Sequence, residues 1–230
     1  CLMTRMVEQG VIHVPADDKV EVELHLPTNL ARVELVQSAA GLTQVLLDIQ
    51  VPTFRQDLID LNELANLLGI SRDDFSAEHP HETAVGDFIH LIVPVKDLAV
   101  MQRITPDFNG IINFCHKHDI QTIAAFSKQV EKLENTIHVR DFCPAVGVPE
   151  SAAAGTTNGA LTSYLVRHNI VEANDDGVIF VQAEQGHEIN RPSSVRSIVN
   201  MDSGAIKRLQ VGGVATKIMD GELHLPSTSP

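Results

Sequence analysis

Alternating apolar and polar positions predict a series of short strands near the start of the chain. Such runs occupy four ranges, which are 11–14, 20–26, 31–37 and 44–51. Pro, Asn, Gly and paired Asp residues separate them. A period of two is typical of a strand with one buried face, and turn residues between the runs favour antiparallel neighbours. This part of the chain is therefore predicted to form a largely antiparallel sheet.

Between residues 55 and 69 the apolar positions change to a helical spacing, and Gly69 stands where a left-handed residue would end the helix. The apolar face of this helix comprises Leu58, Leu61, Leu64, Ala65 and Leu68. The polar stretch that follows, 71–83, indicates a crossing between two lobes. We therefore predict an N-terminal lobe over 1–82 and a C-terminal lobe over 83–230, and we allow the last strand to cross to the first lobe.

Beyond residue 82 the strands become more apolar and a few helices separate them. The run 88–95 is too apolar for a strand with one face in water, and short helices are predicted from Asp97 and around 109–118. Further strands are predicted at 122–127, 136–143, 177–186, 194–200 and 205–216. Many strands and few helices predict an α+β fold in which sheets curl around single buried helices.

Residues 140–168 hold the most informative pattern, an extended run followed by a turn of small residues and an amphipathic helix. A helix start carries free backbone N–H groups and the positive end of the helix dipole. Gly155, Thr156 and Thr157 at this start therefore form a candidate socket for an anion such as a substrate carboxylate. Gly155 permits close approach of a ligand, and either Thr can cap the helix. An ordinary capped helix without a ligand has the same pattern, so both interpretations remain open.

Charge and cysteine content exclude several classes of partner. The chain has 230 residues, of which 17 are Lys or Arg and 30 are Asp or Glu, and its formal charge is −13. Such a charge argues against a surface for nucleic acid or an anionic membrane. The cysteines are odd in number without a CxxC pair, which argues against a disulfide framework or a zinc site. No apolar run reaches the ~20 residues of a membrane span. We expect a soluble, cytoplasmic protein.

Five segments spread along the chain carry motifs that are more specific together than singly. They are GDFIHLIVPV (86–95), CPAVGVPE (143–150), the Gly-Thr helix start with NGAL (155–161), QG…NRPSSV (185–195) and VGGVA (211–215). In this order they resemble the phenazine-biosynthesis PhzF-like family of the diaminopimelate epimerase superfamily. The resemblance implies two lobes, each a rolled mixed β-sheet around a central helix, with the active site between them. It also implies proton transfer on a small carboxylate substrate without metal or cofactor, and pairing as a homodimer.

Two departures from the family pattern affect the predicted site. The family's acidic base lies in an N-terminal portion that this sequence does not contain, and the opening residues CLMTRMVEQG resemble the last turns of a helix. We therefore expect an incomplete first lobe. The family also places an acidic residue four positions before the helix-opening Gly, where this chain has Ser151.

The resemblance makes Ser151, with its neighbour Glu150, the predicted catalytic position. A serine hydroxyl can hydrogen-bond a substrate, but near neutral pH it cannot deliver a proton as a tuned carboxyl can. Glu150 substitutes for the acid only if the turn is rearranged, and the alternative is a solvated turn carboxylate. The loss of the acid also leaves open a second function, that of a catalytically silent homologue that binds a small molecule.

Two further residues complete the predicted substrate site. Arg191, in the QG…NRPSSV segment, is suited to hold either an anion or an internal carboxylate. Gly212 interrupts a strand, which indicates close approach of the backbone to a ligand or to a neighbouring strand. His90 lies near the expected cleft, but a structural, hydrogen-bonded histidine is the favoured interpretation. Cys143 is interpreted as a packing residue.

Overall fold

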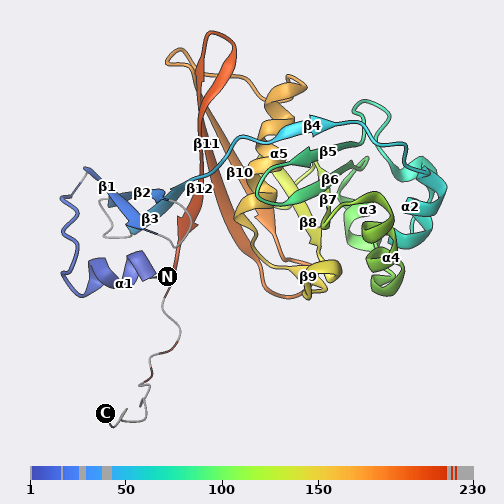
Figure 1. Cartoon of the computed structure of the whole chain (residues 1–230), viewed down its shortest axis with the longest axis horizontal. Coiled ribbons are helices and arrows are strands. Elements are labelled where there is room, and N and C mark those ends of the chain that lie inside the picture. The colour runs from blue at the N-terminus through green and yellow to red at the C-terminus, as the bar shows by residue number, and fades with distance from the viewer. Residues whose placement is uncertain are drawn as a thin grey trace.

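The structure, a computed structural model, describes residues 2–16, 18–25, 30–37, 43–216, 219 and 221. In these residues a single mixed sheet follows the order β1-β2-β3-β12-β11-β10-β8-β7-β6-β5-β4, and β9 pairs with β8 off this path. Figure 1 shows the sheet curving around α5, with α2, α3 and α4 beyond the strands β5 to β8. None of the described helices is long and apolar enough to cross a membrane.

The first strands form an antiparallel meander with a small core of its own. It consists of α1 (Leu2–Glu8), β1 (Lys19–His25), β2 (Leu30–Gln37) and β3 (Thr43–Asp48). Met3, Val14, Val33 and Leu35 are its buried apolar residues. The strand predicted over 11–14 is wrong, because Val14 packs into this core without any described strand pairing beside it. The predicted end of the next strand at residue 26 lies outside the described residues.

The last strand of the sheet completes this meander. β12 (Ala205–Val214) pairs antiparallel with β3, from Gln210 opposite Asp48 to Val214 opposite Gln44. On its other edge β12 pairs with β11, so it joins the meander to the larger part of the sheet. Strands that are far apart in the sequence, β3 and β12, thus lie side by side.

The larger part of the sheet contains both parallel and antiparallel pairs. β6 runs parallel to β7, and β8 runs parallel to β10, while the remaining ladders are antiparallel. Its strands are β4 (Thr53–Arg55), β5 (Glu82–Val85), β6 (Ile89–Pro94), β7 (Thr122–Ser127), β8 (Ile137–Phe142), β9 (Glu150–Ser151), β10 (Val178–Gln185) and β11 (Ser193–Asp202). Its helices are α2 (Leu61–Leu68), α3 (Leu98–Arg103), α4 (Phe108–His118) and α5 (Gly155–Arg167), with short 3-10 turns at Arg72–Asp74 and Pro144–Val146. The α+β class with a large mixed sheet is confirmed.

Two apolar cores lie on opposite faces of these strands. On the inner face α5 is buried continuously from Thr157 to Leu165, and its apolar residues pack against β7, β8, β10 and β11. On the outer face α2, α3 and α4 pack against the alternate residues of β6 and β7. Because successive side chains of a strand point to opposite faces, a polar residue faces either α5 or the outer helices according to its place in the alternation.

The α2 helix is shorter than its sequence pattern predicted. Its N-cap is Asp60, whose carboxylate accepts hydrogen bonds from the backbone N–H groups of Asn62 and Glu63, so the helix begins at Leu61. Leu58 precedes it and is fully exposed, whereas Gly69 ends it with a φ of 67°, as predicted. Because α2 packs into the outer core beside β6 and β7, the lobe boundary predicted near residue 82 cuts through that core.

Candidate active site

The start of α5 has no side-chain cap. Its N-cap residue is Ala154, and among the described residues no side chain accepts a hydrogen bond from the first turn. The predicted capping by Thr156 or Thr157 is therefore wrong. Thr157 turns instead to a buried carboxylate, with its hydroxyl 2.9 Å from Oδ2 of Asp141. The N–H groups and positive dipole end of α5 are thus left for another acceptor.

A cavity of about 910 Å³ opens at this end of α5. Ala153, Ala154 and Gly155 line one side of it, and residues of β3, β11 and β12, among them Gly212, line the other. Such a volume lies within the range of small-molecule pockets. The structure therefore brings two of the predicted binding residues, Gly155 and Gly212, into one cavity.

Gly212 also has a structural role that requires a glycine. A Cβ atom there would overlap the carbonyl oxygen of Val45 on the adjacent strand β3. The sequence left open whether Gly212 approaches a ligand or a neighbouring strand, and this contact supports the neighbouring strand. Its place in the cavity wall follows from that approach.

Arg191 does not line the large cavity, although the next residues do. It is exposed, and its backbone N–H donates to the carbonyl of Gly186 to close the turn before β11. Pro192 and Ser193 follow it in the cavity wall. The Ser193 hydroxyl donates to the carbonyl of Ala152 and so ties β11 to the turn before α5.

The two predicted catalytic residues lie on opposite faces of the sheet. In the β8–β9 ladder Ser151 is opposite Asp141, and Glu150 is opposite Phe142. Paired residues in an antiparallel ladder share a face. Asp141 faces α5, since it contacts Thr157, so Ser151 lies on the α5 side. Glu150 lies on the outer side.

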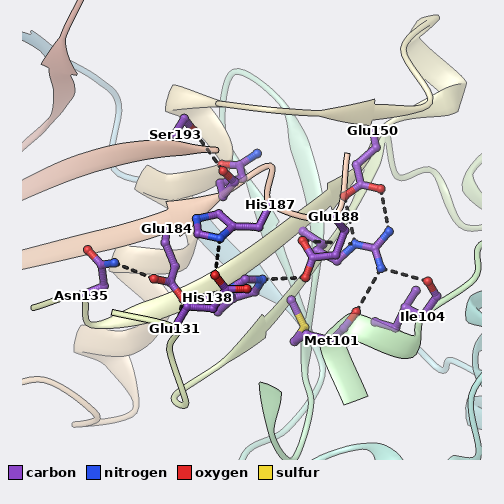
Figure 2. Close-up of polar contacts among 12 residues, drawn as sticks. Met101, Ile104, Glu131, Asn135, His138, Glu150, Glu184, His187, Glu188 and Ser193 are labelled. Carbon is purple, nitrogen blue, oxygen red and sulfur yellow. Dashed lines mark hydrogen bonds and ion pairs between the residues drawn. The ribbon is translucent and has the colours of Figure 1, made fainter. Parts of the chain in front are cut away.

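Glu150 forms a buried ion pair on that outer side. Its carboxylate oxygens lie 2.9 Å and 2.8 Å from Nε and Nη2 of Arg140. The remaining guanidinium nitrogen donates to the carbonyls of Met101 and Ile104, as Figure 2 shows. Glu150 is therefore not the solvated turn carboxylate that was one reading of the sequence. Its pairing and its orientation both argue against the catalytic role predicted for it.

Asp141 is the acidic group that the structure places nearest to the start of α5, and the sequence analysis missed it. Asp141 is 2% exposed. Burial raises the pKa of its carboxyl to about 6, against the hydrogen bonds from Thr157 and Thr122, which lower it. The nearby Glu150 charge adds to the increase. The signal was available in the strand IHVRDF, where alternation places Asp141 on the face of Ile137 and Val139.

His90 lies on the same inner face, two strands away from Asp141. It is 2% exposed, and its Nδ1 lies 2.7 Å from the hydroxyl of Thr122. Burial lowers the pKa of His90 to about 4, so the imidazole is neutral. A second, small cavity of about 10 Å³ is lined by His90, Thr156 and residues that include Phe88. This volume is about that of one water-sized probe.

Cys143 is buried at the end of β8, in agreement with its interpretation as a packing residue. Burial, together with the charges of Asp141 and Glu150, raises the pKa of its thiol to about 12. The thiol is therefore protonated at neutral pH and is a poor nucleophile.

A second polar cluster lies on the outer face of β8, and Figure 2 shows its members converging. His138 is fully buried, with Nδ1 2.8 Å from Glu184 and Nε2 2.8 Å from Glu188. Burial alone lowers the pKa of His138, but the hydrogen bonds to Glu188 and Glu184 raise it overall. Both ring nitrogens of His138 are paired, as in a structural network, whereas Glu188 Oε2 has no hydrogen bond among the described residues and lies 3.9 Å from Arg140 Nε.

The fold and this geometry define a protein with a small-molecule cavity at a helix start inside a rolled mixed sheet. The chain belongs to the phenazine biosynthesis-like protein family, whose model matches residues 9–221. This confirms the family to which the sequence motifs pointed.

Two relatives and one solved structure show how far the similarity extends. The chain is 29% identical to the trans-2,3-dihydro-3-hydroxyanthranilate isomerase of Pseudomonas fluorescens over 192 residues, which are 83% of this chain and 63% of that protein. It is 24% identical to the uncharacterized isomerase YddE of Escherichia coli (strain K12) over 159 residues, 69% of this chain and 52% of that protein. The crystal structure of the Bacillus anthracis phenazine biosynthesis protein of the PhzF family is similar with a TM-score of 0.78 and 21% identity, covering 92% of this chain and 69% of that one. The chain thus spans about half the length of curated isomerases that it matches.

Proposed function

We propose that this protein binds a small carboxylate at the start of α5 and moves a proton on it, as a cofactor-independent isomerase acting in the cytoplasm. The observation that carries the proposal is the uncapped start of α5, which opens onto a cavity of about 910 Å³. Backbone N–H groups and the helix dipole stabilise an anion there. Membership of a family that contains isomerases supports the reaction class.

The socket can be tested with a matched pair of ligands. Anthranilate carries a carboxylate, and anthranilamide has the same ring with an uncharged amide. We expect calorimetry to detect binding of anthranilate and not of anthranilamide. Thr156→Val should weaken anthranilate binding roughly 3- to 10-fold, the value of one hydrogen bond, and Thr156→Ser should restore it. Equal affinity of Thr156→Val and wild type would remove Thr156 from the socket.

A second candidate function is a catalytically silent protein that binds a small molecule. The observation that favours it is Ser151 on the α5 side of β9, where the family has an acid, with Glu150 tied to Arg140 on the other side. Vinylacetate is a suitable probe, because moving one of its protons yields crotonate. In deuterated water, a gain in deuterium uptake by Ser151→Asp over wild type, absent in Ser151→Asn, would indicate a degenerate enzyme. No deuterium uptake by either the wild type or Ser151→Asp would favour the binding protein.

A further inference from the structure

Three polar residues form a row across the inner face of β6, β7 and β8. They are His90, Thr122 and Asp141, each at most 3% exposed. Residues further along the same faces are apolar and pack against α5: Ile92, Ala124 and Val139. Burying three polar groups in one row costs free energy unless their hydrogen bonds are made. A group that stays unpaired therefore calls for an explanation, such as a function. The row lies at the end of the face where α5 begins, because Asp141 contacts Thr157.

Contacts connect Thr157, Asp141, Thr122 and His90 in that order, and one ring nitrogen of His90 has no partner among the described residues. Thr157 donates to Asp141 Oδ2, and the Thr122 hydroxyl is close enough to lower the pKa of the Asp141 carboxyl. The Thr122 contact is the looser one, since Asp141 Oδ1 has no hydrogen bond of ordinary geometry among the described residues. Thr122 also contacts His90 Nδ1 at 2.7 Å. The other ring nitrogen, His90 Nε2, is buried and has no partner in the described part of the chain.

The hydroxyl between the two titratable groups sets the tautomer of the histidine. A threonine hydroxyl has one proton to donate. If that proton points to the ionised Asp141, the Thr122 oxygen accepts from His90 and the ring proton lies on Nδ1. The lone pair of the neutral ring is then on Nε2. Because Nδ1 is occupied by Thr122, Nε2 is the ring nitrogen available to the small cavity that His90 and Thr156 line.

We propose that His90 is a catalytic residue that accepts and returns the proton, and that Thr122 and Asp141 are positioning residues that hold its Nε2 in the basic form. This inference rests on the proposed function and gives the site a proton carrier that Ser151 cannot supply. The small cavity admits about one water molecule, and in this proposal that water relays the proton from a ligand at the start of α5, where Thr156 lines the small cavity and the adjacent Gly155 lines the large one.

The proposed step needs no further reactant. A C–H bond next to the ligand's carboxylate breaks, its electron pair is delocalised over the ligand, and an N–H bond forms at Nε2 with one water relaying the proton. The return of the proton to a different carbon restores the neutral ring. While His90 is charged, the ionised Asp141 stabilises it through Thr122, as the carboxylate of a catalytic triad stabilises its histidine.

The first test reads the tautomer and does not depend on activity. In protein labelled with ¹⁵N-histidine, the ring signals of His90 are identified by their loss in His90→Asn. We expect a protonated Nδ1 and an unprotonated Nε2 near pH 8. Asp141→Asn and Thr122→Val should each perturb this tautomer. A proton on Nε2 in the wild type would overturn the inference while leaving the carboxylate socket untouched.

The second test measures chemistry and binding together on the full chain. We expect wild type to convert vinylacetate to crotonate with uptake of deuterium, and His90→Asn to slow this ~10²-fold or more. Asn keeps a donor near Nδ1, whereas His90→Gln places an amide near Nε2, and neither can carry the proton. Anthranilate affinity should stay within about 3-fold of wild type in both variants, which shows that they are folded.

The outcomes separate the two proposals. Turnover of vinylacetate by His90→Asn at the wild-type rate would overturn the role of His90 alone. Binding of anthranilate by the wild type without any exchange on vinylacetate would overturn both the isomerase function and the role of His90. Wild-type exchange that is lost in His90→Asn, and lowered in Asp141→Asn without loss of binding, would support the inference.

Discussion

The two faces of β8 bury ionisable groups equally well, but they treat them differently. On the outer face every side-chain nitrogen of Arg140 and His138 has a hydrogen-bond partner, and the oxygen left without one is Glu188 Oε2. On the inner face Asp141 keeps one carboxylate oxygen unpaired, and His90 two strands away keeps one ring nitrogen unpaired. Burial alone therefore does not distinguish a structural polar group from a functional one. A missing hydrogen bond alone does not distinguish them either, since Glu188 Oε2 on the outer face also lacks one, so each face is tested by removing one charge.

The largest effect is expected on the outer face, at Arg140. Arg140→Met leaves Glu150 charged, buried and unpaired, and removes the donor to the carbonyls of Met101 and Ile104. We expect the free energy of unfolding to fall by about 3–5 kcal/mol in urea denaturation. The double variant Arg140→Met with Glu150→Met should recover much of this loss, because no charge then remains buried. A single variant that is nearly as stable as wild type would show that the outer face is not a structural network.

On the inner face the opposite sign is expected. The pKa of Asp141 is raised by burial to about 6 in the folded state, so the folded protein loses stability as pH rises from about 4 through about 6 and Asp141 ionises. Asp141→Asn removes this loss of stability, because asparagine does not ionise. The variant should be more stable than wild type by about 1–3 kcal/mol near pH 8, with the difference vanishing near pH 4. Asp175→Asn, in an exposed loop, is the control and should change little at either pH. A destabilised Asp141→Asn near pH 8 would place Asp141 with the structural groups.

The smallest effect is a pH dependence on the outer face at His138. Hydrogen bonds to Glu188 and Glu184 raise the pKa of His138 overall, although burial opposes them. Its contribution to stability is therefore fully present below about pH 6.5 and is lost as pH rises through the raised pKa. The cost of His138→Gln should be greater near pH 6 than near pH 9 by on the order of 1 kcal/mol. His116→Gln, at an exposed position, serves as the control. An equal cost at both pH values would mean that the charge of His138 contributes nothing.

Periodicity predicted most elements because alternation and helical spacing are local properties of the chain. Strands β6, β7 and β8 lie within one residue of their predicted bounds, Gly69 is the predicted C-cap, and Asp97 caps the helix that was predicted to start there. The short strand β4 was missed because three residues give no readable alternation. The run 11–14 was misread because alternation cannot show whether a partner strand is available.

The site was less predictable because its groups depend on pairing across strands. The small-residue turn predicted the start of α5, which follows from local sequence, whereas the cavity beside it also needs the distant strands β3, β11 and β12. Sequence distance pointed to Glu150, which is next to Ser151, and not to Asp141, which lies ten positions before it. Only the register of β8 against β9 shows that Asp141 shares a face with Ser151 and that Glu150 does not.

The antiparallel pairing of β12 with β3 also has a consequence for how the protein is made. The partner of Asp48 is Gln210, so the meander of β1, β2 and β3 keeps an open edge until the ribosome has synthesised β12. Exposed strand edges recruit other chains, and contacts this distant along a sequence form slowly. Newly translated molecules should therefore depend on chaperones that shield β3 during elongation.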